Sequence, residues 1–139
     1  MAQDLIFDWN RTDDQAKVFP KVEICDETLR DGIQSPSVHD PSIEDKLAMV
    51  ALMEKLSITT ADIGLPGAGP RAIKDVLAIA KFVQEQKFKL KLNCAARTLA
   101  QDIEPIARIV QQVGIPIEVY CFLGASPIRQ LVRIGGSSG

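Results

Sequence analysis

The sequence predicts an α/β fold with a parallel sheet, and three observations support this class. Short apolar runs alternate with segments whose apolar residues recur at helical spacing, one strand–helix unit per roughly thirty residues, the pattern of βαβ units. Apolar residues make up 46% of the chain, which is enough for a core. The formal net charge of −2 gives no electrostatic reason to expect nucleic acid or an anionic membrane as a partner.

The first half of the chain begins with a segment that we expect to be an N-terminal arm, residues 1–21. The apolar run 22–25 predicts the first strand. Ser42 suits the N-cap of a helix with acids in its first turn. Apolar positions of that helix recur at Ile43, Leu47, Val50, Met53 and Leu56. Residues 58–63 predict the second strand, closed by a turn containing Gly64 and Pro66.

The second half repeats the pattern. Pro70 suits the first position of a second helix, whose apolar stripe reaches Val83. Residues 90–94 alternate as a third strand, and residues 98–101 resemble a capping box for a third helix that ends at Gly114. Residues 115–123 predict the fourth strand, and 127–134 predict the start of another helix. We therefore expect an arm over 1–21, one α/β domain over 22–134, and a tail or linker over 135–139.

Two architectures fit four such units. An open doubly wound parallel sheet of four or five strands suits a chain of 139 residues. A (β/α)₈ barrel has the same repeat but needs about 250 residues. Length alone therefore favours the open sheet.

The number and spacing of the cysteines indicate the cellular compartment in which the protein is found. Cys25, Cys94 and Cys121 are an odd number, each lies in or beside an apolar run, and none forms a CxxC pair. We expect all three to be buried and reduced, which predicts a cytoplasmic protein. The longest apolar runs match strands and helix faces and not a membrane span.

Polar side chains follow every predicted strand. The first strand is followed by Asp26, Arg30, Asp31 and Gln34; the second carries Asp62; the third gives Asn93 and Arg97; the fourth is followed by Ser126 and Arg129. The carboxyl ends of parallel strands are where α/β proteins bind substrates, so these residues are candidates for a site. The alternative is that they are capping, turn and ion-pair residues. His39, the only histidine, lies in a turn-rich loop and is a weak candidate ligand.

The run Thr28-Leu29-Arg30-Asp31-Gly32-Ile33-Gln34 resembles the signature of a known superfamily, the DRE-TIM metallolyases. It includes the α-isopropylmalate, homocitrate and citramalate synthases, which use acyl-CoA, and the hydroxymethylglutaryl-CoA lyases. Further similarities follow in order. Residues 62–66 resemble the second-strand motif, although the family usually has Glu where this chain has Asp62. Arg97 with Asp102 resembles the third-strand region of the synthases, and residues 126–128 resemble the fourth-strand end.

The resemblance covers residues 22–130 and implies the N-terminal half of a (β/α)₈ barrel of about four βα units, in place of the open sheet favoured by length. It implies that Asp31 binds a divalent metal (Mg, Mn or Zn) and that Arg30 stabilises a developing oxyanion. It also implies that Gln34 lines a 2-oxo acid pocket. Asp62, Arg97 and Ser126 are the further substrate-binding candidates.

The implied reaction is a Claisen-type condensation of acetyl-CoA with a 2-oxo acid. Cleavage of the lyase type remains an alternative, although Arg97 favours the synthases. A third alternative is a non-catalytic half-barrel that acts only through association. The family completes its metal site with a His-x-His pair that these 139 residues do not contain. We therefore expect little or no activity from this chain alone, and a homodimer or higher oligomer through exposed sheet edges.

Overall fold

The computed structural model describes the backbone of residues 22–135 and the side chains as far as Leu131, so the expected arm and most of the expected tail lie outside the described residues. The chain divides into two compact units. Glu23–Phe122 form one unit, which contains the sheet and three helices. The flanking residues form the other, whose described helix is α4, Pro127–Gly135.

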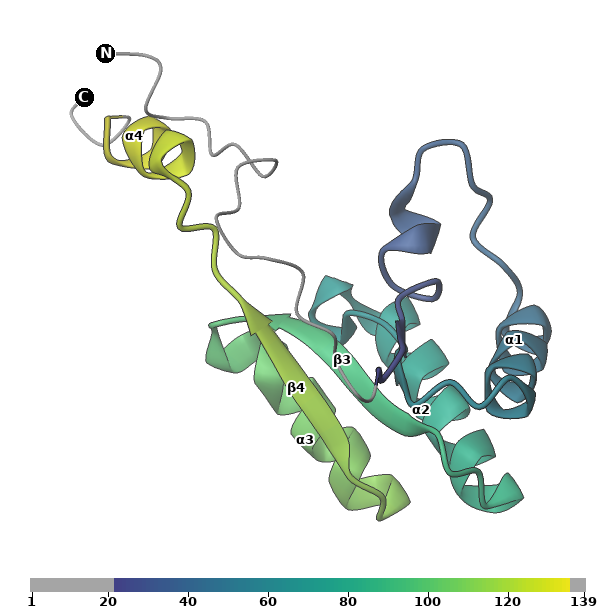
Figure 1. Cartoon of the computed structure of the whole chain (residues 1–139). Helices are drawn as coiled ribbons and strands as arrows, with labels where there is room; N and C mark the ends of the chain where they lie inside the picture. The colour runs from purple at the N-terminus through teal and green to yellow at the C-terminus, as the bar shows by residue number, and fades with distance from the viewer. Residues whose placement is uncertain (1–21, 136–139) are drawn as a thin grey trace. The chain divides into compact units, whose positions relative to one another are not determined.

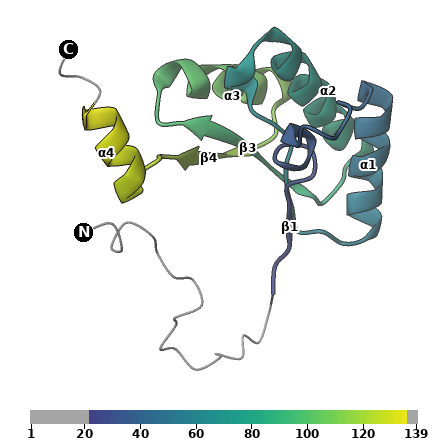
Figure 2. The ribbon, with the colours of Figure 1, turned by 90° about the horizontal axis from the view of Figure 1, so that it is seen from above.

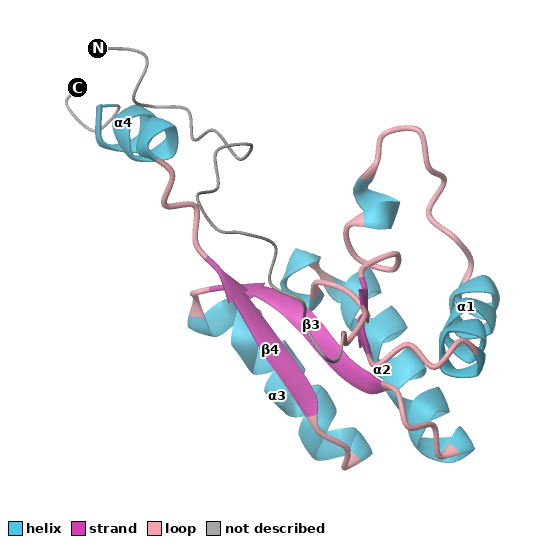
Figure 3. Cartoon of the chain, in the orientation of Figure 1, coloured by secondary structure: helices cyan, strands magenta, loops and turns pink. Residues whose placement is uncertain are grey.

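Four parallel strands form the sheet (Figures 1 and 3). They are β1 Cys25–Asp26, β2 Thr60–Asp62, β3 Lys91–Arg97 and β4 Ile117–Phe122. Neighbours in the sheet follow the chain order β1-β2-β3-β4. A doubly wound sheet reverses its strand order at a switch point, whereas a barrel adds each strand beside the previous one. The predicted half of a (β/α) barrel is therefore confirmed, and length was a poor guide.

Three helices cover one face of this sheet: α1 Ile43–Lys55, α2 Pro70–Gln86 and α3 Ala100–Val113 (Figure 2). Alternate strand residues pack against them in the core, namely Ala61, Ile63, Leu92, Cys94 and Ala96. Because successive side chains of a strand point to opposite faces, Asp62 and Asn93 lie on the other face, which these helices leave uncovered. One face of the sheet is thus part of the core, and the other carries the polar side chains of Asp62 and Asn93 together with the aromatic side chains of Tyr120 and Phe122 on β4.

Several local signals act as the sequence predicts. The Ser42 hydroxyl accepts a hydrogen bond from the Asp45 N–H at 3.2 Å and begins α1. Pro70 is the first residue of α2, and Gly114, with φ of 78°, ends α3. The predicted capping box is wrong. Leu99 precedes α3 and makes no side-chain cap, because contacts between Arg97 and Asp102 organise that turn instead.

Two further expectations need correction. Cys94 is buried, but Cys25 and Cys121 are exposed, because they lie on the two outer strands of the sheet, where fewer side chains cover them. The first strand was predicted over residues 22–25, but β1 comprises only Cys25–Asp26. Val22 and Ile24 therefore lie before the strand, and both are exposed. Within the described part of the chain, no helix is long and apolar enough to cross a membrane.

Candidate active site at the ends of the first two strands

A tight turn follows β1 and sets the position of the signature residues. The carboxylate of Asp26 accepts a hydrogen bond from the Thr28 N–H at 2.8 Å. The Glu27 carbonyl then accepts from the backbone N–H groups of Arg30, Asp31 and Gly32. This arrangement is the local side-chain and turn bonding that aspartate favours after a strand. With Leu29 buried in the core as an anchor, the turn directs Arg30 back over the strand ends.

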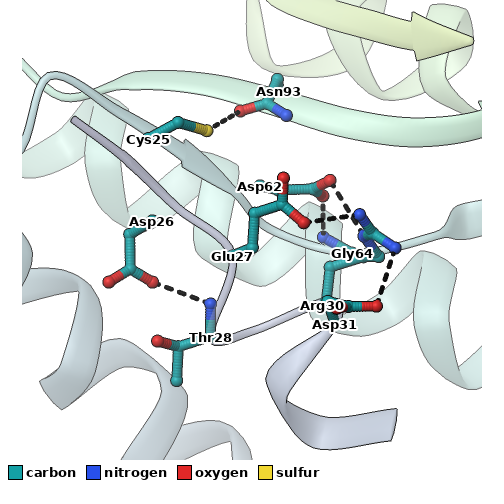
Figure 4. A network of polar contacts seen from close by, with 9 residues as sticks. All are labelled: Cys25, Asp26, Glu27, Thr28, Arg30, Asp31, Asp62, Gly64 and Asn93. Carbon is teal, nitrogen blue, oxygen red and sulfur yellow. Dashed lines mark hydrogen bonds and ion pairs between the residues drawn. The ribbon is translucent and has the colours of Figure 1, made fainter. Parts of the chain in front are cut away.

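Three carboxylates surround the guanidinium of Arg30 (Figure 4). Its Nη2 donates to Glu27 at 2.6 Å, its Nη1 to Asp31 at 3.2 Å and its Nε to Asp62 at 3.2 Å. The Arg30 side chain is 23% exposed, so these charge-assisted bonds are partly shielded from water. One cation among three anions leaves the site with an excess of negative charge. We name this group the Arg30 network: Glu27, Arg30, Asp31 and Asp62.

Asp62 is the buried member of the network, at 2% exposed. Burial raises the pKa of its carboxyl above the usual range. Hydrogen bonds from the Gly64 N–H and from Arg30 oppose that shift by favouring the charged form. A buried carboxylate with a raised pKa beside a guanidinium is typical of acid–base sites, and also of structural ion pairs.

Asp31 is the most accessible carboxylate of the network. Its side chain is 66% exposed, and its contact with Arg30 is a single bond. Among the described residues, no three His, Cys, Asp or Glu side chains come together in a way that could hold a metal ion. Glu27, Asp31 and Asp62 converge on a guanidinium. These residues therefore do not form a metal site by themselves, and Asp31 is at most one ligand of a larger set.

A cavity of about 340 Å³ lies beside the network. Arg30 and Gln34 both line it, so the structure brings these two predicted residues together. Its walls are otherwise mainly apolar, from the turn after β1, the loop after β2 and α2, and they include Leu29, Ile33, Leu65 and Val76. A largely apolar pocket with a few placed polar groups is the usual form of a small-molecule site.

A buried lysine closes another wall of this cavity. Lys46 of α1 is 4% exposed and donates to Asp40 at 2.7 Å and to Asp75 of α2 at 2.8 Å. Burial by itself would lower the pKa of Lys46, but the two carboxylates outweigh it and raise the pKa. Arg71 also contacts Asp40, at 2.7 Å. We name Asp40, Lys46, Arg71 and Asp75 the Lys46 clasp, because they tie the loop after β1 to two helices.

Arg97 lies at the end of β3 and is paired with a helix residue. Its Nε and Nη2 donate to the carboxylate of Asp102 at 2.6 and 2.8 Å, and its backbone N–H donates to the same group. These side-chain bonds hold the pKa of Asp102 below its usual range. Asp102 also packs under Gly67, where a Cβ would meet its Cγ at 2.6 Å. Gly67 therefore serves this close approach, and not the phosphate cradle that a glycine-rich turn can suggest.

The remaining candidates lie elsewhere. Ser126 belongs to the other compact unit, where its hydroxyl accepts a hydrogen bond from the Arg129 N–H at 3.3 Å at the start of α4. His39 is exposed in the loop between β1 and α1.

Sequence reasoning missed two important residues. Glu27 makes the shortest bond of the Arg30 network, yet it was not among the residues predicted for the site. Lys46 was not among the residues predicted for the site, although it follows Ile43 by three positions and so shares the buried side of α1. That spacing was the available signal.

A partial (β/α) barrel with this signature at the end of its first strand defines a class of protein, and comparison with known families agrees. The HMGL-like family profile matches residues 21–133, and the chain belongs to that family.

Three relatives carry the name 2-isopropylmalate synthase. The protein of Lactococcus lactis subsp. cremoris (strain SK11) is 32% identical over 109 residues, which are 78% of this chain and 20% of that protein. The Streptococcus gallolyticus (strain UCN34) protein is 31% identical over 114 residues, 82% and 21% respectively. The Stenotrophomonas maltophilia (strain R551-3) protein is 32% identical over 111 residues, 80% and 20%. The chain thus spans about a fifth of the length of these relatives.

Proposed function

We propose that residues 22–130 form the first half of the active-site barrel of an acyltransferase that condenses acetyl-CoA with a 2-oxo acid. The observation that carries this proposal is the Arg30 network, which gathers the signature residues and Asp62 at one end of the sheet, where α/β barrels bind substrates. Relatives named 2-isopropylmalate synthase support the condensation over the other reactions of the superfamily.

The residues have distinct roles in this proposal. Arg30 is the catalytic cation: its Nη1 and Nη2 each keep a second N–H that can bond a substrate oxygen as negative charge develops. Asp62 and Glu27 hold the guanidinium in place. Gln34 contributes its amide to the cavity beside Arg30, where the 2-oxo acid would bind. Arg97 and Ser126 are substrate-binding candidates by resemblance alone.

A divalent metal belongs to this proposal through Asp31. The described residues do not complete a site for it, so further ligands have to come from outside them. Such an ion would act as a Lewis acid on the 2-oxo acid.

Two alternatives remain. Lyase-type cleavage would use a similar first-strand corner, and Arg97 at the end of β3 is the residue that favours the synthases. A non-catalytic role through association is favoured by the two outer strands of an open sheet. We expect the 139-residue chain alone to release no coenzyme A from acetyl-CoA with a panel of 2-oxo acids. Turnover by the purified chain would show that half a barrel suffices.

A segment exchange tests the proposed reaction. Residues 22–130 would replace the matching segment of the Lactococcus lactis relative, and thiol release would be followed with acetyl-CoA and 2-oxo acids. We expect the folded chimera to release coenzyme A only when a 2-oxo acid is present. A chimera that folds with the melting temperature of its parent but does not turn over would contradict the proposal, and cleavage of a hydroxyacyl-CoA would favour the lyase.

A further inference from the structure

Asn93 is a buried polar residue that has no role in the reaction proposed above. It lies in the middle of β3 on the face of the sheet that the helices leave uncovered, and it is fully buried. Its Oδ1 accepts a weak hydrogen bond from the Cys25 thiol at 3.9 Å. Its Nδ2 has no hydrogen-bond partner among the described residues. Buried amide groups are nearly always satisfied, so a donor of this kind calls for a partner from elsewhere.

The position of Asn93 connects it to the Arg30 network. In the sheet register Asn93 lies directly beside Asp62 on one side and Glu118 on the other. Figure 4 shows the amide next to Asp62, with its oxygen turned toward Cys25 and its nitrogen turned away from it. The three nitrogens of Arg30 each donate to a carboxylate already, whereas the Asn93 nitrogen donates to none. Asn93 Nδ2 is therefore an unpaired donor on the strand position directly beside Asp62 of this network.

The charges around Asn93 indicate what kind of oxygen it would bind. Asp62 and Glu118 flank it, so a carboxylate ligand at this position would meet two like charges. A neutral carbonyl oxygen accepts from an amide without that repulsion. Cys25 and Tyr120 share this face of the sheet with Asn93, and both are exposed, whereas Asn93 itself is fully buried.

We infer that Asn93 is a further substrate-binding residue, whose Nδ2 donates to the carbonyl oxygen of an acyl thioester bound on the uncovered face of the sheet. The inference rests on the proposed function, because acetyl-CoA supplies the thioester. The bond strengthens when negative charge develops on that oxygen, so Asn93 would contribute to stabilising the enolate together with Arg30.

The test uses the side-chain amide signals of the 139-residue chain in solution. The chain has two asparagines, Asn10 and Asn93, so asparagine-selective ¹⁵N labelling gives two pairs of amide signals. Acetyl-CoA, coenzyme A and pyruvate would be titrated to millimolar concentrations. We expect the Asn93 pair to shift with acetyl-CoA, and to remain in place with coenzyme A and with pyruvate. The Arg30 Nε–H signal reports on binding at the network itself.

Three results would overturn the inference. If the Arg30 signal shifts with acetyl-CoA and the Asn93 pair does not, Asn93 is not a ligand, and the proposed function stands. If coenzyme A shifts the Asn93 pair equally, the thioester carbonyl is not the acceptor. If neither signal shifts, both the inference and the substrate assignment fail for this chain.

A variant gives an independent readout. Asn93→Leu removes the unpaired Nδ2 and the weak thiol contact of Oδ1 and puts an apolar group of similar size in their place, so we expect the urea midpoint to stay the same or rise. We also expect the acetyl-CoA titration followed at the Arg30 Nε–H to weaken at least tenfold. A variant that unfolds more easily and binds acetyl-CoA as tightly as the parent would show that Asn93 is structural.

Discussion

A few short contacts determine which side chains fit at single positions of this chain, and Gly67 is the clearest example. Its Cα lies over the carboxylate of Asp102, and two bonds from the Arg97 guanidinium prevent that carboxylate from moving away. A glycine is needed here for the space, because a methyl group would overlap atoms that cannot shift. The same contacts connect the loop after β2 with the end of β3, so one residue affects the geometry of two strand ends.

Gly67→Ala should therefore destabilise the protein by about 1–3 kcal/mol, the usual cost of overpacking. Urea unfolding monitored by circular dichroism measures the change. Gly32→Ala is the matched control, because a Cβ at Gly32 meets nothing closer than 3.7 Å. Equal midpoints for the two variants would show that the approach of Gly67 to Asp102 is not tight.

At the scale of the elements, the site depends on how the loop after β1 is held. The Lys46 clasp joins Asp40 at the end of this loop to α1 and α2. The Lys46 side chain is 5% exposed, so its charge is largely shielded from water. Removing the lysine leaves Asp40 and Asp75 without this counter-ion. This loss of folding free energy is larger than the contribution of a typical surface ion pair.

Lys46→Met should lower the free energy of unfolding at neutral pH by about 1–3 kcal/mol. It should also raise amide exchange in residues 35–41 more than in β3. The hydrogen bond from Lys46 lowers the pKa of Asp40 in the folded state, so this contribution is present above the unfolded pKa of Asp40 and is lost as acid protonates that carboxyl. The difference between variant and parent should therefore shrink below about pH 4.

Lys74→Met, on an exposed position of α2, is the control for the Lys46 variant. It should change neither the midpoint nor the exchange pattern. A pH-independent loss in Lys46→Met, or a uniform rise of exchange over the whole unit, would indicate a packing defect and contradict the role of the clasp.

At the scale of the molecule, the described sheet of four parallel strands has two outer strands, β1 and β4, and one face that helices α1, α2 and α3 do not cover (Figure 2). On β4, Tyr120 and Phe122 are 42% and 46% exposed, although parallel sheets are normally covered on both faces. Such surfaces favour association with another sheet edge. Pairing of copies of the chain through their sheet edges, expected from the sequence, stays a prediction.

The chain alone should therefore form dimers or larger species that dissociate on dilution, as measured by light scattering after gel filtration. Tyr120→Lys should shift the distribution toward monomer by placing a charge beside the outer strand. Leu52→Lys changes another exposed apolar residue, 55% exposed and on α1, and should have no effect. A monomer at all concentrations, or equal effects of the two variants, would exclude pairing through β4.

The helices and part of the candidate site could be predicted from the sequence, whereas the strand order and most of the contacts could not. The helices were predicted well because Ser42, Pro70 and Gly114 are strong local signals. The strand order was not readable from periodicity, since barrel and doubly wound sheets share one local pattern, and it needed the signature of residues 28–34. Arg30, Asp31 and Asp62 were predicted as site residues, but their partners were not. Contacts between residues distant in sequence, such as Lys46 with Asp75, leave no mark on local composition.

The central claim is that Arg30, held by three carboxylates, supplies the cation of an acyl-condensing site. The most direct test is the rate of coenzyme A release by the chimera that carries residues 22–130, compared with its Arg30→Lys variant. Lysine keeps the charge but cannot reproduce three directed bonds, so the rate should fall about 100-fold or more while the melting temperature changes little. Arg108→Lys, on the exposed side of α3, should leave the rate unchanged. A fall of less than about threefold in the Arg30→Lys variant would contradict the claim, because an oxyanion-stabilising cation contributes far more than that.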